Sequence, residues 1–273
     1  MADFCSTKKD IISAEGIYPH LLQNLQCDIS GRIFVFDSLE STNKTAKEML
    51  PADANHGTII IADSQTAGKG RYGRSFFSPP GHGLYMSLIL HSTKLPFSSM
   101  TLATVHAAVS VCKAIEAVSG KSPMIKWVND LFLNGKKFCG ILTESVISPQ
   151  KPCSQWIIIG IGINFDTPAT VFPENIRQTA GSLFGVETAP VTRNHLAAEI
   201  INRVFLPGKQ YSEKELLAEY KQKVFLLGNE VLVTGTGDPY KAIAVDIDDT
   251  GNLIVKKDTG EFLTLYSGDV SLR

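Results

Sequence analysis

The sequence predicts an α+β protein in two parts, a larger domain with a mixed set of strands and helices followed by a small all-β domain. Its 273 residues exceed one typical domain of about 100–200 residues, so a second, smaller unit is expected. Apolar runs typical of buried strands alternate with helical patterns as far as residue 227, and from Gly228 short alternating strands follow Gly/Asp turns. We therefore expect an N-terminal arm at residues 1–30, a main domain at 31–227 and a small domain at 228–273.

Composition argues against several classes of protein. The formal net charge is −1 at pH 7, so no general positive field for nucleic acid or anionic lipid is expected. The five cysteines contain no C-x-x-C pair and the six histidines are scattered, which argues against a disulfide framework and a protein-held metal. Neither a signal peptide nor an apolar run of about 20 residues is recognised. These features favour a cytoplasmic protein that does not enter a membrane.

The first part of the chain predicts an arm, a strand and a helix. Residues 1–30 carry broken amphipathic character and are expected to pack on the main body as an arm or short helix. Residues 32–36 are β-branched and aromatic, which predicts a strand. Ser41, Thr42 and Asn43 then suit the start of a helix, either as caps or as ligand-binding groups.

A glycine-rich basic loop is expected between strands at residues 57–62 and 83–90. It holds three glycines beside Lys69, Arg71 and Arg74, a combination that suits a phosphate chain. Its spacing is neither that of a P-loop nor that of a Rossmann fingerprint. The alternative is a solvated surface loop without a ligand.

The central part predicts a long helix and a hairpin. Apolar residues recur at helical spacing over 98–119, where His106 is expected to be a packed or half-exposed residue rather than a ligand. Residues 124–133 are largely apolar, and Asn134-Gly135 then indicates a hairpin with a return strand. This hairpin brings Asp130 near Lys137, either as a structural ion pair or as functional groups.

The remaining elements are a strand at residues 156–164, helices at about 192–205 and 212–225, and four short strands after Gly228. Gly160 and Gly162 leave one face of the first strand without side chains, which admits a neighbouring backbone or a flat ligand.

Several separate segments, taken in order, resemble the biotin protein ligase family. The segments are residues 40–43, 65–74, 126–130, Lys137 with 140–144, 160–164 and 267–273. The resemblance implies a catalytic domain with a mixed central sheet, of the biotin/lipoate protein ligase type, followed by an SH3-like β-barrel. It also implies a two-step reaction in which biotin and ATP, with Mg²⁺, give biotinyl-AMP. A lysine of a biotin carboxyl carrier protein then accepts the biotin.

The resemblance assigns roles to individual residues. The catalytic candidates are Lys137, Arg71 and Asp130. The candidates for biotin binding are Ser41, Thr42, Asn43, Gln65, Gly68, Lys69, Gly70, Arg71 and Lys137. The candidates for nucleotide binding are Lys69, Arg71, Arg74, Phe76, Asn129 and Asn164, and no residue is assigned to a metal.

Two other functions remain open at this stage, a lipoate–protein ligase and a non-catalytic module that binds biotin or its adenylate. DNA binding is not expected, since residues 1–30 are too short for a winged helix. The oligomeric state is left open, with a homodimer as one option.

Overall fold

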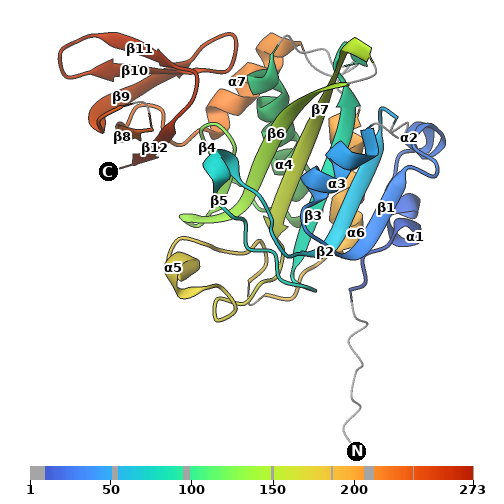
Figure 1. Ribbon diagram of the computed structural model, residues 1–273. Helices are drawn as coiled ribbons and strands as arrows, with labels where there is room; N and C mark the ends of the chain where they lie inside the picture. Colours follow the sequence, from blue (N-terminus) through green and yellow to red (C-terminus); the bar gives the residue numbers. More distant parts are fainter. Residues whose placement is uncertain are drawn as a thin grey trace, which may run out of the picture.

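Two β-sheets organise the chain in the computed structural model, which describes residues 10–50, 55–94, 99–148, 151–185, 187–205, 212–235 and 237–272. Seven strands form the larger sheet in the order β1-β2-β3-β7-β6-β5-β4, and five form a second sheet in the order β11-β10-β9-β8-β12 (Figure 1). The predicted α+β fold with a large mixed sheet and a small β unit is confirmed. The boundaries after residues 30 and 227 stay predictions, and residues 1–9 of the expected arm lie outside the described residues.

The larger sheet is mixed. Its strands are β1 (Ile33–Leu39), β2 (Thr58–Gln65), β3 (Gly83–His91), β4 (Met124–Lys126), β5 (Asp130–Leu133), β6 (Lys136–Ser148) and β7 (Lys151–Asn164). Strands β1 and β2 run parallel, and every other neighbouring pair is antiparallel.

One expected strand, residues 124–133, is in fact two. The chain turns at residues 127–129, so that β4 pairs with β5 and Lys126 lies opposite Asp130. The turn was hidden in the apolar run because its residues Trp127 and Val128 are themselves buried. The hairpin predicted at Asn134-Gly135 is confirmed, with φ of 50° and 75° at these residues, as a tight β-turn of this type requires.

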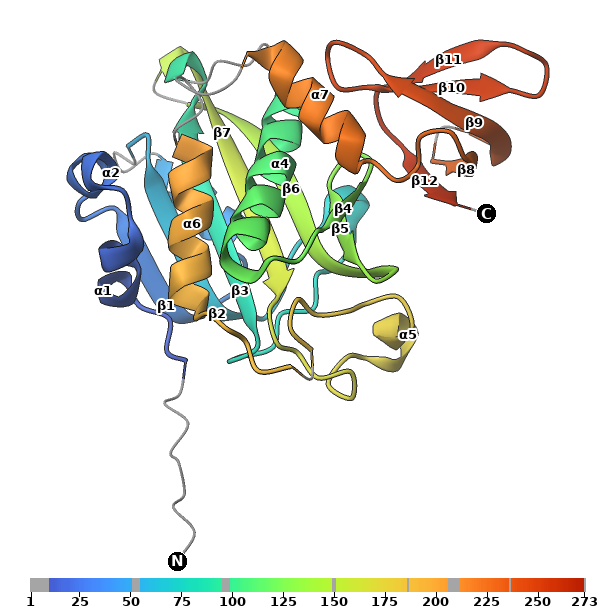
Figure 2. The same ribbon diagram turned by 180° about the vertical axis from the view of Figure 1, so that it is seen from behind.

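Helices cover both faces of the larger sheet. Helices α4 (Met100–Ser119) and α6 (Arg193–Phe205) lie on one face, and α3 (Thr42–Met49) lies on the other (Figures 1 and 2). The predicted end of α4 at residue 119 is confirmed, with Gly120 next in a left-handed conformation, whereas the helix starts at Met100 after a Ser99 cap, two residues later than predicted. The remaining helices are α1 (Ala14–Ile17), α2 (Gln23–Asp28), α5 (Glu174–Arg177) and α7 (Glu213–Lys223), with 3₁₀ turns η1 (Tyr18–His20), η3 (Arg71–Gly73) and η4 (Ser92–Lys94).

Helix α4 corrects one expectation from the sequence. It is long and apolar enough, by composition alone, to cross a membrane, although no such stretch was recognised. However, 72% of its most apolar window is buried inside the fold. Burial against the sheet and α6 accounts for this composition, because a helix enclosed on most sides is apolar all round.

His106 on α4 is a packed residue, as predicted. It is buried, and its Nε2 lies 3.1 Å from the carbonyl oxygen of Val204. Burial lowers the pKa of His106 from 6.5 to about 4, against a smaller opposing effect of the Val204 hydrogen bond.

This histidine should make the fold sensitive to acid. As the pH falls below 6.5, the unfolded chain binds a proton at His106 that the folded protein does not take up until about pH 4. A shift of this size corresponds to about 3 kcal/mol of lost stability, complete near the lower pKa. Urea unfolding from neutral pH down to about pH 4 should therefore show a shallower loss for His106→Gln than for the wild type. Parallel pH profiles of the two proteins would contradict this.

The small sheet docks on the larger domain through a turn. Its antiparallel strands are β8 (Glu230–Thr234), β9 (Tyr240–Ile247), β10 (Leu253–Lys257), β11 (Phe262–Leu265) and β12 (Asp269–Leu272), of which β12 was not predicted as a strand. The indole Nε1 of Trp127 donates to the carbonyl oxygen of Gly251 at 2.9 Å. An added Cβ at Gly251 would lie 3.0 Å from Thr101 of α4, so this turn fits closely against the helix.

Candidate active site

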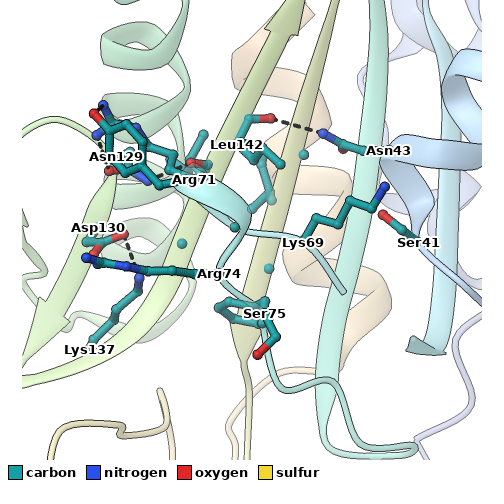
Figure 3. Close-up of a pocket in the computed structure, with 18 of the residues that line it drawn as sticks. Ser41, Asn43, Lys69, Arg71, Arg74, Ser75, Asn129, Asp130, Lys137 and Leu142 are labelled. Atoms are coloured by element: carbon teal, nitrogen blue, oxygen red, sulfur yellow. Dashed lines mark hydrogen bonds and ion pairs between the residues drawn. The ribbon is translucent and has the colours of Figure 1, made fainter. Parts of the chain in front are cut away.

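A cavity of about 130 Å³ lies between the glycine-rich loop and the face of the larger sheet that carries α3. Most of the predicted site residues meet in it. Those lining the cavity are Ser41, Thr42, Asn43, Gln65, Lys69, Gly70, Arg71, Arg74, Phe76, Asn129, Asp130 and Lys137. Figure 3 shows Asp130 and Lys137 at one end and Ser41 and Asn43 at the other. The glycine-rich loop is therefore a wall of a pocket rather than an isolated surface loop.

Polar groups at the start of α3 form one end of the pocket. Ser41 occupies the N-cap position, but its side chain makes no capping hydrogen bond. The backbone N–H and the hydroxyl of Thr42 both donate to Oε1 of Gln65, at 2.9 and 3.2 Å. Gln65 in turn donates from Nε2 to Ser78 at 2.9 Å. Side-chain capping by Ser41 is therefore wrong, and the amide of Gln65 is held in a defined orientation.

Asn43 is fixed by residues that the sequence analysis missed. Its Nδ2 donates to Glu144 at 2.9 Å and to the carbonyl oxygen of Leu142 at 3.3 Å, while the hydroxyl of Ser87 donates to its Oδ1 at 2.6 Å. Ser87 is fully buried in β3. The serine within the apolar run 83–90 was the available signal, because a buried polar group requires a partner.

The glycines of β7 form the floor of the pocket. A Cβ added at Gly160 would lie 2.2 Å from Oδ1 of Asn43, and one at Gly162 would lie 2.7 Å from the ring of Phe76. The neighbours of the bare strand face are therefore side chains rather than another backbone, and both glycines also line the cavity. The glycines allow Asn43 and Phe76 to lie directly on the sheet.

We expect Gly160→Ala to weaken ligand binding without unfolding the protein. The new methyl group would displace Asn43 from the hydrogen bonds that orient it, so that its amide could no longer reach the ligand. The loss of one hydrogen bond to a buried polar ligand lowers affinity roughly tenfold or more. Calorimetry with biotin, the ligand that the sequence resemblance implies, measures the change. The control is Ile159→Val, which trims the opposite face of the same strand. Equal affinities for Gly160→Ala and the wild type would contradict the prediction.

An ion pair occupies the other end of the pocket. The Nζ of Lys137 lies 2.7 Å from Oδ1 of Asp130, and both side chains are mostly buried, 35% and 21% exposed. The predicted proximity of the two residues is confirmed. A Cβ added at Gly140 would lie 3.4 Å from Cε of Lys137, so this glycine leaves room for the lysine to fold over the strand. Beside the pair, Arg71 donates to Oδ1 of Asn129 at 3.2 Å.

The small domain also contributes to the pocket, through Gly268 and Asp269. Asp269 lies 2.8 Å from Arg74 and 3.1 Å from Lys126. Burial alone would raise the pKa of Asp269, but the hydrogen bonds and charges of Arg74 and Lys126 lower it more, so its pKa lies below the usual value. This carboxylate is therefore ionised at neutral pH. The sequence analysis assigned no role to these two residues, although both lie in segment 267–273 of the resemblance.

Two predicted site residues do not line the cavity. Gly68 lies beneath the loop, where an added Cβ would be 2.5 Å from the carbonyl oxygen of Phe76. Asn164 is buried at the end of β7 and donates to the carbonyl oxygen of Gly181 at 3.0 Å. Its Oδ1 has no hydrogen-bond partner among the described residues. It is therefore a buried acceptor that a ligand donor could satisfy.

No cluster of three or more His, Cys, Asp or Glu side chains suited to a metal occurs in the described part of the chain. The two carboxylates that line the pocket, those of Asp130 and Asp269, are both ion-paired. The donor set therefore does not form a protein cage for a cation. A cation carried by ligand phosphates would need only one or two carboxylates.

Comparisons with known proteins agree with this arrangement. Residues 35–164 match the Biotin/lipoate A/B protein ligase family, and residues 226–273 match the Biotin protein ligase C terminal domain. The "Bifunctional ligase/repressor BirA" of Bacillus subtilis is 33% identical over 256 residues, covering 91% of this chain and 76% of that protein. The "Biotin–[acetyl-CoA-carboxylase] ligase" of Mycobacterium tuberculosis is 27% identical, covering 86% and 87% of the two chains.

A solved structure shows the same architecture. The biotin protein ligase from Aquifex aeolicus, in complex with biotin and ATP, superposes with a TM-score of 0.75 at 28% identity. The match covers 89% of this chain and 99% of that one, so it includes the large sheet and the small domain together. With both family matches and the relatives above, the chain belongs to the biotin protein ligase family.

Proposed function

We propose that this protein is a biotin–[acetyl-CoA-carboxylase] ligase that activates biotin with ATP and transfers it to a lysine of a biotin carboxyl carrier protein. One observation carries the proposal. A single pocket joins an ordered polar end, formed by Thr42, Asn43 and Gln65, to a Lys137–Asp130 ion pair under a basic loop. The family relationship supports the same activity.

The polar end suits the ureido ring of biotin. A buried ureido group must find partners for all its donors and acceptors, because each unpaired group costs about 1–3 kcal/mol. Ser41, Thr42, Asn43 and Gln65 offer hydroxyl and amide groups, and the bonds to Ser87 and Glu144 hold Asn43 in place before the ligand binds. We assign these residues to biotin binding.

The basic end suits the first reaction step. An oxygen of the biotin carboxylate attacks the α-phosphorus of ATP, and the bond from that phosphorus to pyrophosphate breaks. The two reacting groups are both anionic, so positive charge must be directed at the transferred phosphoryl group. We assign this task to Lys137 and Arg71, with Lys69 and Arg74 on the loop and Asn129 and Asn164 for the nucleotide.

Phe76 is assigned to the nucleotide as an apolar surface. Its ring lies on the glycine floor beside Gly162 and Gly140, where a flat base could stack against it. Gly68 and Gly70 let the loop backbone lie close to the ligand. At Gly68 the packing of the loop also leaves no room for a Cβ.

In the second step the lysine amine of the carrier attacks the acyl carbon and AMP leaves. The amine must lose its proton to become a nucleophile. Asp130 is the carboxylate available at this end of the pocket to orient the amine and accept the proton. A closed loop would also keep water away from the mixed anhydride.

Mg²⁺ is proposed to enter with the triphosphate. When bound there it neutralises phosphate charge during the first step. The paired state of both pocket carboxylates fits a cation held mainly by phosphate oxygens and water.

We place the protein in the cytoplasm. The free cysteines Cys27, Cys112 and Cys139 are compatible with a reducing compartment. DNA binding is no part of the proposal. A homodimer remains an option that the proposal does not require.

The test is pyrophosphate release from biotin, ATP and Mg²⁺, followed by labelling of a carrier-domain lysine. Release no greater than in a control without biotin would refute the enzyme and leave a binding module. The same assay with lipoate in place of biotin tests the other activity of this family. Lipoate-dependent release without biotin-dependent release would assign the protein as a lipoate ligase.

A further inference from the structure

The tip of the glycine-rich loop contacts the small domain at two points. The hydroxyl of Tyr72 accepts a hydrogen bond from the backbone N–H of Gly268 at 2.8 Å, across 196 positions of sequence. Next to it, Nη1 of Arg74 lies 2.8 Å from Oδ2 of Asp269. We call these four residues the domain clasp. It joins the loop to the segment that enters β12.

Tyr72 also touches the residue proposed to bind phosphate. Nη2 of Arg71 donates to the Tyr72 hydroxyl at 3.0 Å, and the guanidinium lies 5.0 Å from the centre of its ring. The other guanidinium nitrogen of Arg71 donates to Asn129 at 3.2 Å. The direction of the Arg71 side chain is therefore set by Tyr72 on one side and by Asn129 on the other.

The backbone of Tyr72 is held in an unfavourable conformation. Its φ of 56° and ψ of 33° are left-handed, a region that residues with a side chain rarely occupy. Its ring is also largely exposed, so burial does not explain the conformation. The left-handed backbone places the Tyr72 hydroxyl between Gly268 and Arg71. Strained backbone conformations of this kind cluster at functional sites.

Asp269 extends the clasp to the hairpin of the large sheet. Its other oxygen, Oδ1, lies 3.1 Å from Nζ of Lys126 at the end of β4. One carboxylate thus bridges a cation on the loop and a cation on the sheet. The small domain fixes the loop relative to the strand pair that carries Asp130.

From these contacts we propose that Tyr72 is a positioning residue, and that the domain clasp keeps the loop closed over the acyl-adenylate. The inference rests on the proposed function and deepens it by giving the small domain a role in the same site. Tyr72 acts through Arg71, which it aims at the phosphate side of the ligand. The clasp should slow escape of the adenylate and leave binding of biotin alone unchanged.

The test measures dissociation of chemically synthesised biotinyl-adenylate, which requires no catalysis. Tyr72→Phe keeps the ring and removes the hydroxyl. The dissociation rate should rise roughly tenfold, the effect of losing one hydrogen bond to a charged group, while the affinity for biotin stays within about twofold.

Tyr18→Phe is the matched control. The Tyr18 hydroxyl likewise accepts a backbone N–H, that of Gly31, at 2.7 Å, but it lies in the N-terminal arm away from the pocket. It should leave the dissociation rate unchanged. Equal rates for Tyr72→Phe and the wild type, or equal increases in both variants, would overturn the proposal.

A second variant tests the charged half of the clasp. Asp269→Asn should also accelerate dissociation, and more strongly at low salt than at high salt. In the double variant with Tyr72→Phe, the dissociation rate should rise by less than the product of the two single increases, because both substitutions release the same loop. If the two substitutions multiply the dissociation rate independently, the two contacts do not act together on the loop, and the proposed clasp is wrong. If the wild type does not retain the adenylate, both this inference and the proposed function fail. If the wild type retains the adenylate and the variants release it at the wild-type rate, the inference alone fails.

Discussion

We expect Lys137→Gln to lower the rate of pyrophosphate release roughly 10²–10³-fold at saturating biotin and ATP. The ammonium group lies in the pocket on the space left by Gly140, 2.7 Å from Asp130. At this position it can stabilise the charge that develops on the transferred phosphoryl group. Glutamine keeps a comparable length and a hydrogen-bond donor but removes the charge.

The adjacent Lys136 provides the matched control. It is exposed, starts the same strand, and its side chain packs beside Gly181 outside the cavity. Lys136→Gln should therefore release pyrophosphate at the wild-type rate. A comparable loss in both variants would mean that the general positive charge of the hairpin, rather than Lys137 itself, supports the reaction.

Local sequence signals predicted most of the fold because they report directly on backbone geometry. Gly120 ends α4, and Asn134-Gly135 supplies the positive φ values of the hairpin. The hydrophobic pattern did not show the β4–β5 turn because Trp127 and Val128 are apolar and buried, so hydrophobicity continued through it. Hydrophobic pattern indicates burial and does not by itself show where an apolar chain reverses.

The site was predictable where its parts are close in sequence. Asp130 and Lys137 are separated by one hairpin, so the turn alone brings them together. Tyr72 and Gly268 are 196 positions apart, and no local pattern relates them. The role of Gly160 likewise depends on Asn43, which approaches from a helix on another part of the chain. Contacts of this kind are set by tertiary packing.

We expect Asp130→Asn to separate the two reaction steps. Asparagine is similar in size but cannot accept a proton, and removal of a general base typically costs about 10²–10⁴-fold. Transfer of biotin to the carrier lysine should fall by about this factor. Pyrophosphate release in a single turnover should persist, because Lys137 keeps its charge. Rapid-quench measurement of adenylate and labelled carrier resolves the two rates.

The control for Asp130 is an aspartate in a similar ion pair outside the pocket. Asp246 lies 2.8 Å from Lys221 between β9 and α7, so Asp246→Asn loses a comparable contact. It should leave both steps unchanged. Hydroxylamine, a small nucleophile that needs no such base, should capture the adenylate equally well in Asp130→Asn and the wild type.

The pH dependence of transfer decides what Asp130 does. A free lysine has a pKa of about 10.4, so the fraction of neutral amine rises about tenfold for each pH unit below that value. If Asp130 accepts the proton of the incoming amine, the deficit of Asp130→Asn should shrink steadily as the pH is raised, since more of the carrier lysine arrives already neutral. If Asp130 only holds Lys137 in place, the deficit should remain constant with pH and appear in pyrophosphate release as well. A constant deficit would therefore remove Asp130 from the second step and leave it as the partner of Lys137.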